Sequence, residues 1–282
     1  MIKKRRWRHI TKKNAAVLEA FLKTEEPYCV AACSRVLHAT PHHNEIWGLF
    51  SVSGEMEAAL LCFHQSFFPV FRGNETISIP YFLRYQLLIN PIHALQGLAR
   101  DTAIFEGSLA KMGLIPRETR NYDLMELACE PKAEYFSLGP AGLEVRKPSE
   151  QDAGALFRLQ AAYEVEEVLP NGAELDLPGC RLAAENIIRR DHSFIAVLDG
   201  KPVGKINVSA SSYNYSQAGG VYVLPEYRGR GIAQRLGAVF ARALLAEGKK
   251  ITLFVKKKNA AAKKVYANLG FSVIGDYRIS YY

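Results

Sequence analysis

The stretch that most constrains the fold is residues 221–233, which read VYVLPEYRGRGIA. Four apolar or aromatic residues run into Pro225, and a basic loop containing Gly229 and Gly231 follows. Beyond the loop, apolar residues recur at the spacing of a helix, as at Leu236 and Phe240. The pattern predicts a buried strand, a turn, a loop and a helix in direct succession.

The loop has the composition of an anion-binding site. Gly229 and Gly231 let the backbone turn its N–H groups toward one point, and the start of the following helix adds unpaired N–H groups and a positive dipole end. Arg228 and Arg230 add positive charge. The P-loop and dinucleotide-binding patterns do not fit, because no Gly-Lys-Ser/Thr follows and Gln234 stands where G-x-G-x-x-G requires its third glycine.

A second stretch, residues 259–271, reads NAAAKKVYANLGF. Asn259, Ala262 and Tyr266 are separated by three and four residues, so on a helix they share one face. Gly270 is a natural helix terminator before a strand that begins at Phe271. Taken alone, Tyr266 also fits an ordinary core tyrosine of an amphipathic helix.

Together the two stretches resemble the GNAT superfamily of acyl-CoA-dependent N-acyltransferases. R-x-x-G-x-A at residues 228–233 is similar to the family's pyrophosphate loop, and N-x-x-A-x-x-x-Y-x-x-x-G-F at residues 259–271 is similar to its second motif. Lys256, Lys257 and Lys258 either contact phosphates or form an exposed run. The resemblance implies that acetyl-CoA is bound by Val221, Val223, Arg228, Gly229, Arg230, Gly231, Ala233, Asn259 and Tyr266.

Acyl transfer from a thioester to an amine needs a hydrogen-bond donor for the oxyanion and a proton for the leaving thiolate. The resemblance implies that Tyr266 gives the proton, since a phenol with a pKa of about 10 is protonated at neutral pH. Backbone N–H groups at Val223 and Leu224, where the family's strand bulges, are the expected oxyanion donors.

The base is harder to assign, because residues 217–223 (QAGGVYV) contain no carboxylate. Glu164, Glu166 and Glu167 lie between the first two helices expected in the second half of the chain. We take Glu166 and Glu167, with Tyr266, as the candidate catalytic residues: they would attract a cationic amine or relay its proton. A solvated acidic loop is the equally good alternative.

The chain of 282 residues is long enough for two domains. Prolines and glycines place a linker at residues 130–142, between an N-terminal domain (1–136) and a C-terminal catalytic domain (142–282). The second half predicts a strand at 143–146, a helix started by a capping box at Ser149 and Asp152, a loop at 164–178, a helix at 182–188 and a hairpin across Asp199-Gly200. This order is that of a GNAT domain, an α/β (α+β) fold with a mixed sheet flanked by helices.

The first half predicts helices at 12–24, 29–37 and 102–112, two strands within 45–63, short apolar runs at 67–71 and 77–82, and a buried strand at 85–89. Residues 109–114 (LAKMGL) align with residues 266–271 (YANLGF). Our hypothesis is a tandem architecture whose first domain is a degenerate, non-catalytic copy. An unrelated α/β domain is the alternative.

Composition bears on partners and location. Residues 141–282 carry +6 of the net charge of +8, which suits either CoA or nucleic acid. We expect no nucleic-acid partner, because no RNP-like motif or Cys/His finger is present, and residues 3–8 (KKRRWR) fit a solvated tail. With neither a spanning apolar run of about 18 residues nor a secretory signal, we expect no membrane partner and a cytoplasmic location.

The five cysteines are odd in number and scattered, which does not suggest a disulfide framework. Cys29 and Cys33, with His38 and its neighbouring histidines, superficially resemble a metal cluster. One helical turn apart in an Ala- and Val-rich stretch, the two cysteines fit small core thiols better. We therefore predict no metal site.

The sequence thus predicts an N-acetyltransferase that moves an acetyl group from acetyl-CoA directly to a primary amine, carried by a small molecule or a peptide. The alternative is a non-catalytic acyl-CoA-binding regulatory protein. A third reading, an RNA-associated acetyltransferase, would require a salt-sensitive nucleic-acid complex. The acceptor, the acyl-chain length and the oligomeric state, a dimer included, stay open.

Overall fold

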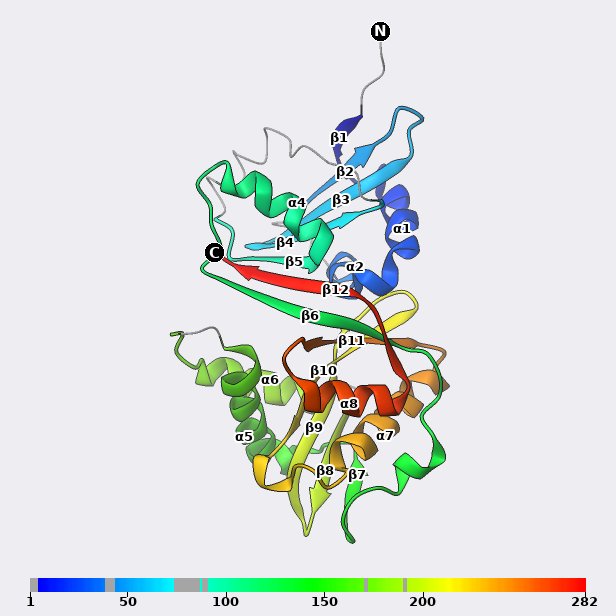
Figure 1. Cartoon of the computed structure of the whole chain (residues 1–282), viewed down its shortest axis with the longest axis vertical. Helices are drawn as coiled ribbons and strands as arrows, with labels where there is room; N and C mark the ends of the chain where they lie inside the picture. The colour runs from blue at the N-terminus through cyan, green and yellow to red at the C-terminus, as the bar shows by residue number, and fades with distance from the viewer. Residues whose placement is uncertain (1–4, 39–43, 74–86, 88–90, 170–171, 190–191) are drawn as a thin grey trace. The chain divides into compact units, whose positions relative to one another are not determined.

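A computed structural model describes residues 5–38, 44–73, 87, 91–169, 172–189 and 192–282 (Figure 1). Contacts divide the chain into two compact units. Unit 1 comprises Met1–Leu124 and Ile274–Tyr282, and unit 2 comprises Met125–Val273. The domain boundaries 1–136 and 142–282 stay a prediction.

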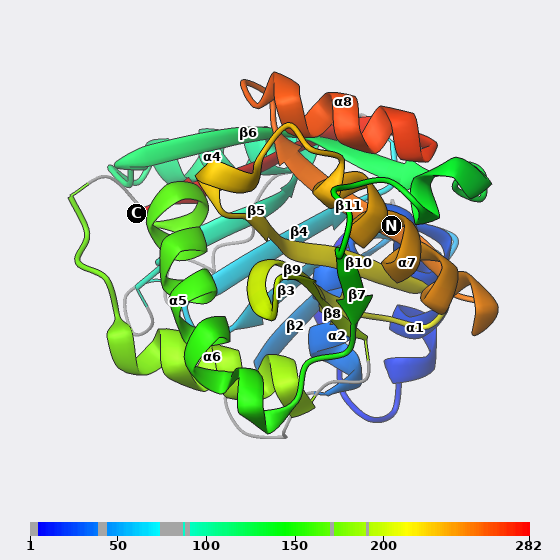
Figure 2. The same cartoon turned by 90° about the horizontal axis from the view of Figure 1, so that it is seen from below.

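Unit 1 is a mixed sheet with helices on both sides (Figures 1 and 2). Its strands run in the order β1-β2-β3-β4-β5-β12, with antiparallel neighbours except for the parallel pair β4 and β5. The strands are β1 (Arg6–His9), β2 (Asn44–Phe50), β3 (Met56–Phe63), β4 (Ser66–Phe71), β5 (Ala94–Leu98) and β12 (Phe271–Tyr281), with β6 (Glu118–Leu127) crossing into unit 2. The helices are α1 (Ala15–Thr24), the short η1 (Glu26–Tyr28), α2 (Val30–Leu37) and α4 (Ala99–Ala110).

Unit 2 repeats this plan. Its strands run in the order β7-β8-β9-β10-β11, antiparallel except for the parallel pair β10 and β11, with α5 and α6 on one side and α7 and α8 on the other (Figure 2). The strands are β7 (Glu144–Arg146), β8 (Ser193–Leu198), β9 (Lys201–Ser211), β10 (Tyr215–Val223) and β11 (Lys250–Lys256). The helices are α5 (Ala153–Tyr163), α6 (Leu177–Arg189), α7 (Ile232–Ala246) and α8 (Ala260–Leu269), with short turns η3 (Glu150–Asp152), η4 (Glu164–Val168) and η5 (Pro225–Tyr227).

The two units agree in strand order, as the hypothesis of a degenerate first copy requires. In each unit the first strand is followed by two helices and a three-stranded antiparallel meander, and the meander's last strand pairs in parallel with the next one. The antiparallel strand added beside β5 is the end of the chain, where Tyr277 is registered with Leu98.

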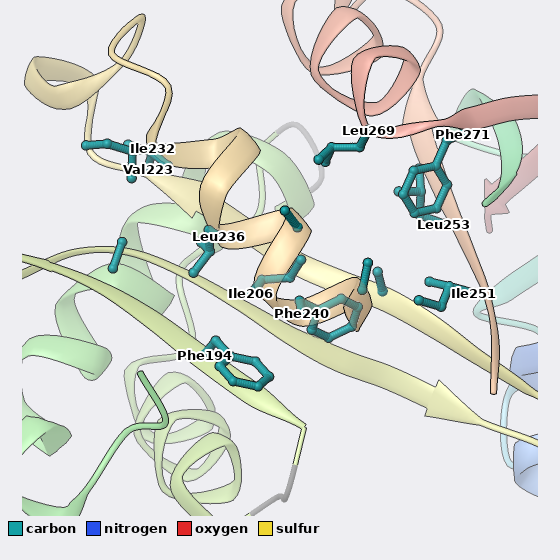
Figure 3. Close-up of a cluster of buried hydrophobic side chains, with 14 of the residues drawn as sticks. Phe194, Ile206, Val223, Ile232, Leu236, Phe240, Ile251, Leu253, Leu269 and Phe271 are labelled. Atoms are coloured by element: carbon teal, nitrogen blue, oxygen red, sulfur yellow. The ribbon is translucent and has the colours of Figure 1, made fainter. Parts of the chain in front are cut away.

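The core of unit 2 forms where α7 lies on the sheet (Figure 3). Ile232, Leu236 and Phe240 recur every four residues, so they project from one face of the helix and are fully buried. The Phe240 ring meets the Phe194 ring of β8 edge to face at 6.4 Å (Figure 3). This packing holds the middle of α7 against the sheet.

Several predictions of local structure are confirmed. Helices cover most of residues 12–24, 29–37 and 102–112, the hairpin turns at Asp199 and Gly200 with positive φ angles of 50° and 75°, and Ser149 and Asp152 form the predicted capping box. Cys29 and Cys33 are buried thiols. The predicted run at 77–82 lies outside the described residues, and so does the strand at 85–89 apart from Leu87, which is helical rather than extended.

Three predictions need correction. The loop expected at 164–178 begins as a π-helical turn, η4, and ends in α6, which starts five residues earlier than predicted. The tail expected at 3–8 contains strand β1, which pairs with β2 although it is mostly exposed. The linker expected at 130–142 contains the short helix η2 (Ala133–Phe136), and Arg242 of α7 lies 4.2 Å from the centre of its Phe136 ring.

Candidate functional site

The basic loop joins the end of β10 to the start of α7, as the sequence predicted. Gly229 and Gly231 adopt positive φ angles of 75° and 80°, which favour glycine, and Gly231 is the N-cap residue of α7. A Cβ atom on Gly231 would also lie 3.2 Å from the Gly139 nitrogen. The first N–H groups of a helix have no carbonyl partner within the helix, because the residues four positions earlier lie outside it. The start of α7 can therefore bind an anion.

Beside the loop, β10 loses its partners on both edges. Its parallel register with β11 covers only Tyr215–Gln217, and its register with β9 shifts between Gly219 and Tyr222. Within this described segment, Gly220 and Val221 are thus registered with neither neighbouring strand. Gly220 has a φ of 59°, as expected of a bulge. The bulge therefore takes the Val221 peptide out of the regular ladder.

The bulge lies upstream of the position that the sequence analysis gave to the oxyanion donors. The Leu224 N–H donates to the Val203 carbonyl at 2.9 Å, so the expectation that Leu224 donates to an oxyanion is wrong. Ladder pairing resumes at Tyr222 and Val223, which are registered with Lys205 and Gly204. Val221 is the residue that the bulge releases from the ladder.

The acidic turn η4 lies against the basic loop. Glu166 Oε2 accepts hydrogen bonds from Arg228 Nη2 at 2.8 Å and from the Tyr222 hydroxyl at 3.1 Å. The bond from Arg228 is the main reason why the pKa of Glu166 lies below its ordinary value. In this arrangement Glu166 is therefore a weak base.

Glu167 contacts the second predicted motif. Lys256 Nζ lies 2.8 Å from Glu167 Oε2, and Asn259 Nδ2 donates to Glu167 Oε1 at 3.4 Å. Lys256 Nζ also donates to the Glu166 carbonyl at 3.3 Å. The two glutamates thus contact Arg228 and Asn259, two of the residues that the resemblance assigns to CoA.

The remaining loop side chains support the backbone. Arg228 Nε donates to the Val223 carbonyl at 2.8 Å, and its guanidinium lies 5.3 Å from the centre of the Tyr222 ring. Arg230 lies 5.7 Å from the centre of the Tyr227 ring. Ala233, in the first turn of α7, packs against the core of unit 2. Arg228 therefore connects the strand end to the acidic turn.

The second motif forms α8, with Asn259 as its N-cap. Asn259 Oδ1 accepts a hydrogen bond from the Ala262 N–H at 3.1 Å, which stabilises the first turn. Tyr266, half-buried, meets the Phe271 ring edge to face at 5.9 Å. Burial, reinforced by Tyr163 and Glu167, raises the pKa of Tyr266 well above its ordinary value. The phenol is therefore protonated and able to donate.

Sequence reasoning missed Lys205, a fully buried lysine in the middle of β9. Its Nζ donates to the Gly220 carbonyl at 2.8 Å and lies 4.6 Å from the centre of the Tyr163 ring. Burial, opposed in part by Glu164, lowers the pKa of Lys205 to about 7. The available signal was a single charged residue among residues 202–208, of which most are apolar.

Two further polar groups accompany Lys205. Glu164 accepts a hydrogen bond from Gln160 Nε2 at 2.7 Å, and burial raises its pKa. Asn207 Oδ1 is buried, and in the described part of the chain it has no hydrogen-bond partner. The segment of the sheet beside the bulge is thus polar, although it lies within the core.

Within the described ranges, no group of three or more His, Cys, Asp or Glu side chains is placed to hold a metal ion. In the same part of the chain, no helix has both the length and the apolar character needed to cross a bilayer.

Comparison with known proteins agrees with this geometry. The family model described as "Acetyltransferase (GNAT) family" matches residues 157–271. No curated protein matches the sequence.

Solved structures resemble the whole chain in fold. A GCN5-related N-acetyltransferase from Sphaerobacter thermophilus has a TM-score of 0.59 at 16% identity, covering 98% of this chain and 94% of that one. A tandem GNAT protein from the clavulanic acid biosynthesis pathway has a TM-score of 0.59 at 15% identity, covering 98% of both chains. A GNAT-family acetyltransferase from Colwellia psychrerythraea has a TM-score of 0.55 at 13% identity, covering 98% of this chain and all of that one.

Proposed function

Residues 157–271 form an acetyltransferase domain of the GNAT family, and on this premise we propose that the chain transfers an acetyl group from acetyl-CoA to a primary amine. The observation that carries the proposal is the coincidence, in unit 2, of a two-glycine loop at a helix N-terminus with a strand that leaves its ladder just before that loop. The first feature suits a diphosphate, and the second suits a thioester.

Acetyl-CoA would supply the activated acyl group, and the loop would hold its diphosphate. Gly229, Gly231 and Ala233 present backbone N–H groups there, and Arg228 and Arg230 add charge. Val221 and Val223 would contact the pantetheine arm along β10. Asn259, as the cap of α8, would contact that arm or keep the adjacent backbone in place.

The chain's own groups would then serve the transfer step. The Val221 N–H would donate to the thioester oxygen as negative charge develops on that oxygen. Such stabilisation of the oxyanion is usually the largest single contribution to catalysis of acyl transfer. Tyr266, kept protonated by its surroundings, would give its proton to the departing thiolate.

Glu166 and Glu167 would have a role that depends on the diphosphate. Arg228 and Lys256 hold the two carboxylates in the structure described here. If these cations turn toward the diphosphate, both carboxylates lose their cationic partners and can attract a cationic amine. The acidic turn would thereby become attractive to the acceptor once the donor is in place.

The alternative, a regulatory protein that binds acyl-CoA without transferring the acyl group, is favoured by one observation. Arg228 lowers the pKa of Glu166, and β10 carries no carboxylate that could replace it as a base. Turnover of any amine separates the two functions.

The experiment is a panel of amines with acetyl-CoA, followed by the release of CoA thiol, together with calorimetry of CoA binding. We expect binding, and turnover of at least one amine that Tyr266→Phe reduces on the order of 10²-fold without a matching loss of CoA affinity. Tyr135→Phe is a matched control, because Tyr135 packs on the same core from η2. Absence of CoA binding would refute both functions, and binding without any turnover would favour the regulatory one.

A further inference from the structure

Lys205 has no evident structural need to be a lysine. It lies fully buried in a central strand, where an ammonium group is expensive and an apolar side chain of similar length would fill the space. Its principal hydrogen bond runs to the carbonyl of Gly220, within the bulge of β10. The bond therefore connects the buried charge to the irregular part of the strand.

The geometry of the peptide group makes this bond informative. In a trans peptide the C=O of one residue and the N–H of the next point in opposite directions. The Gly220 carbonyl points toward Nζ of Lys205, which comes from β9, so the Val221 N–H points away from that amine. Nζ lies 4.6 Å from the centre of the Tyr163 ring of α5, so the amine is on the side of the sheet that α5 covers, and the Val221 N–H points away from that side.

The bulge and the lysine also fit each other sterically. A Cβ atom on Gly220 would lie 2.7 Å from Lys205 Nζ and closer still to Asn207 Oδ1. Any larger residue here would have to displace one or both groups, and the φ of 59° is one that glycine adopts readily. Gly220, Lys205 and Asn207 thus form one polar cluster around a single peptide group.

We propose that Lys205 is a positioning residue for the acyl-transfer reaction. By holding the Gly220 carbonyl on the side of α5, it keeps the Val221 N–H pointing away from α5, where that N–H donates to the thioester oxygen. This inference rests on the function proposed above. Lys205 itself, being buried, touches neither substrate.

The test compares wild type with Lys205→Met, which removes the donor but keeps an apolar chain of similar length. We expect kcat to fall on the order of 10²-fold, as for the loss of an oxyanion donor, while the Kd for CoA changes by less than about threefold. The thermal midpoint should be unchanged or higher, because a buried charge has been removed.

A spectroscopic readout separates positioning from a merely structural role. With acetyl-CoA labelled at the thioester carbonyl, isotope-edited infrared spectroscopy should show the carbonyl band at lower frequency when bound to wild type. The band should return toward its free position in Lys205→Met. Gly220→Ala is a second variant, because its Cβ would displace Nζ, and it should show the same return. Phe194→Leu, in the nearby core, is the control that should leave the band in place.

An unshifted band and an unchanged kcat in Lys205→Met, with wild type active, would overturn this inference and leave the proposed function intact. A fall in kcat matched by an equal fall in CoA affinity would also overturn it, since it indicates general disruption of the site. If wild type fails to bind acetyl-CoA, the proposed function fails first and takes this inference with it.

Discussion

The contact between η4 and the basic loop predicts that Glu166→Gln binds CoA more tightly than wild type. Before Arg228 can serve a diphosphate, its 2.8 Å bond to Glu166 must break. Glutamine keeps the size of the side chain but removes the charge, so the bond that competes with the ligand becomes weaker. The variant also removes a negative charge that repels the anionic ligand.

The magnitude follows from the exposure of the pair. The Arg228 and Glu166 side chains are 43% and 41% exposed, so water and salt screen their attraction. Exposed pairs contribute about 0.2–1 kcal/mol, which corresponds to a tightening of roughly 1.4- to 5-fold. Lys256 and Glu167 are less exposed, at 17% and 25%, so Glu167→Gln should lie toward the upper end of that range.

Calorimetric titration of CoA at low and high salt is the assay, with Glu174→Gln as the control for a change of net charge on an exposed segment. The difference between Glu166→Gln and the control should shrink at high salt, because the screening length shortens. Weaker binding of CoA by Glu166→Gln would refute the reasoning, since it would mean that the carboxylate helps to organise the loop for its ligand.

Three further outcomes are expected. Gly231→Ala should lose most CoA binding by calorimetry, because alanine is strained at a φ of 80° and its Cβ would crowd the Gly139 nitrogen. Asp152→Asn should lower the free energy of unfolding by about 2 kcal/mol at neutral pH, because the bond from Arg146 lowers the pKa of Asp152 to about 2. In wild type this stabilisation is complete above the ordinary pKa of about 4 and disappears as the pH falls toward 2. Denaturant titrations at several pH values measure it. Phe240→Ala should cost about 3–5 kcal/mol in the same measurement, because it leaves a cavity beneath α7.

The parts of the site that the sequence predicted are those that local chain geometry determines. Glycines between a strand and a helix start are typical of loops that turn their N–H groups toward an anion, so Gly229, Gly231 and the start of α7 could be placed without a structure. Asn259 followed by Tyr266 seven residues later gave the face of α8 for the same reason.

The parts that were missed depend on contacts between distant residues. The bulge at Gly220 depends on how β9 and β10 align, and this alignment takes Val221 out of the ladder while the Leu224 N–H stays bonded to the Val203 carbonyl. The bond between Glu166 and Arg228 joins residues 62 positions apart, and composition alone could equally suit a solvated loop. The contact between Lys205 Nζ and the Gly220 carbonyl, on which the role proposed for Lys205 depends, is visible only in the structure.

Strand β12 has a consequence for how the protein is made. Residues Ile274–Tyr282 complete the sheet of unit 1, so β5 lacks one neighbour until they have left the ribosome. A nascent chain that has already released residues 1–124 therefore carries an open sheet edge, a template for pairing with other chains, for the whole time that unit 2 is being translated. Dissection of the protein at residues 136–142 would make that transient state permanent in the first fragment, and we expect such a fragment to aggregate unless the residue 274–282 peptide is supplied in trans.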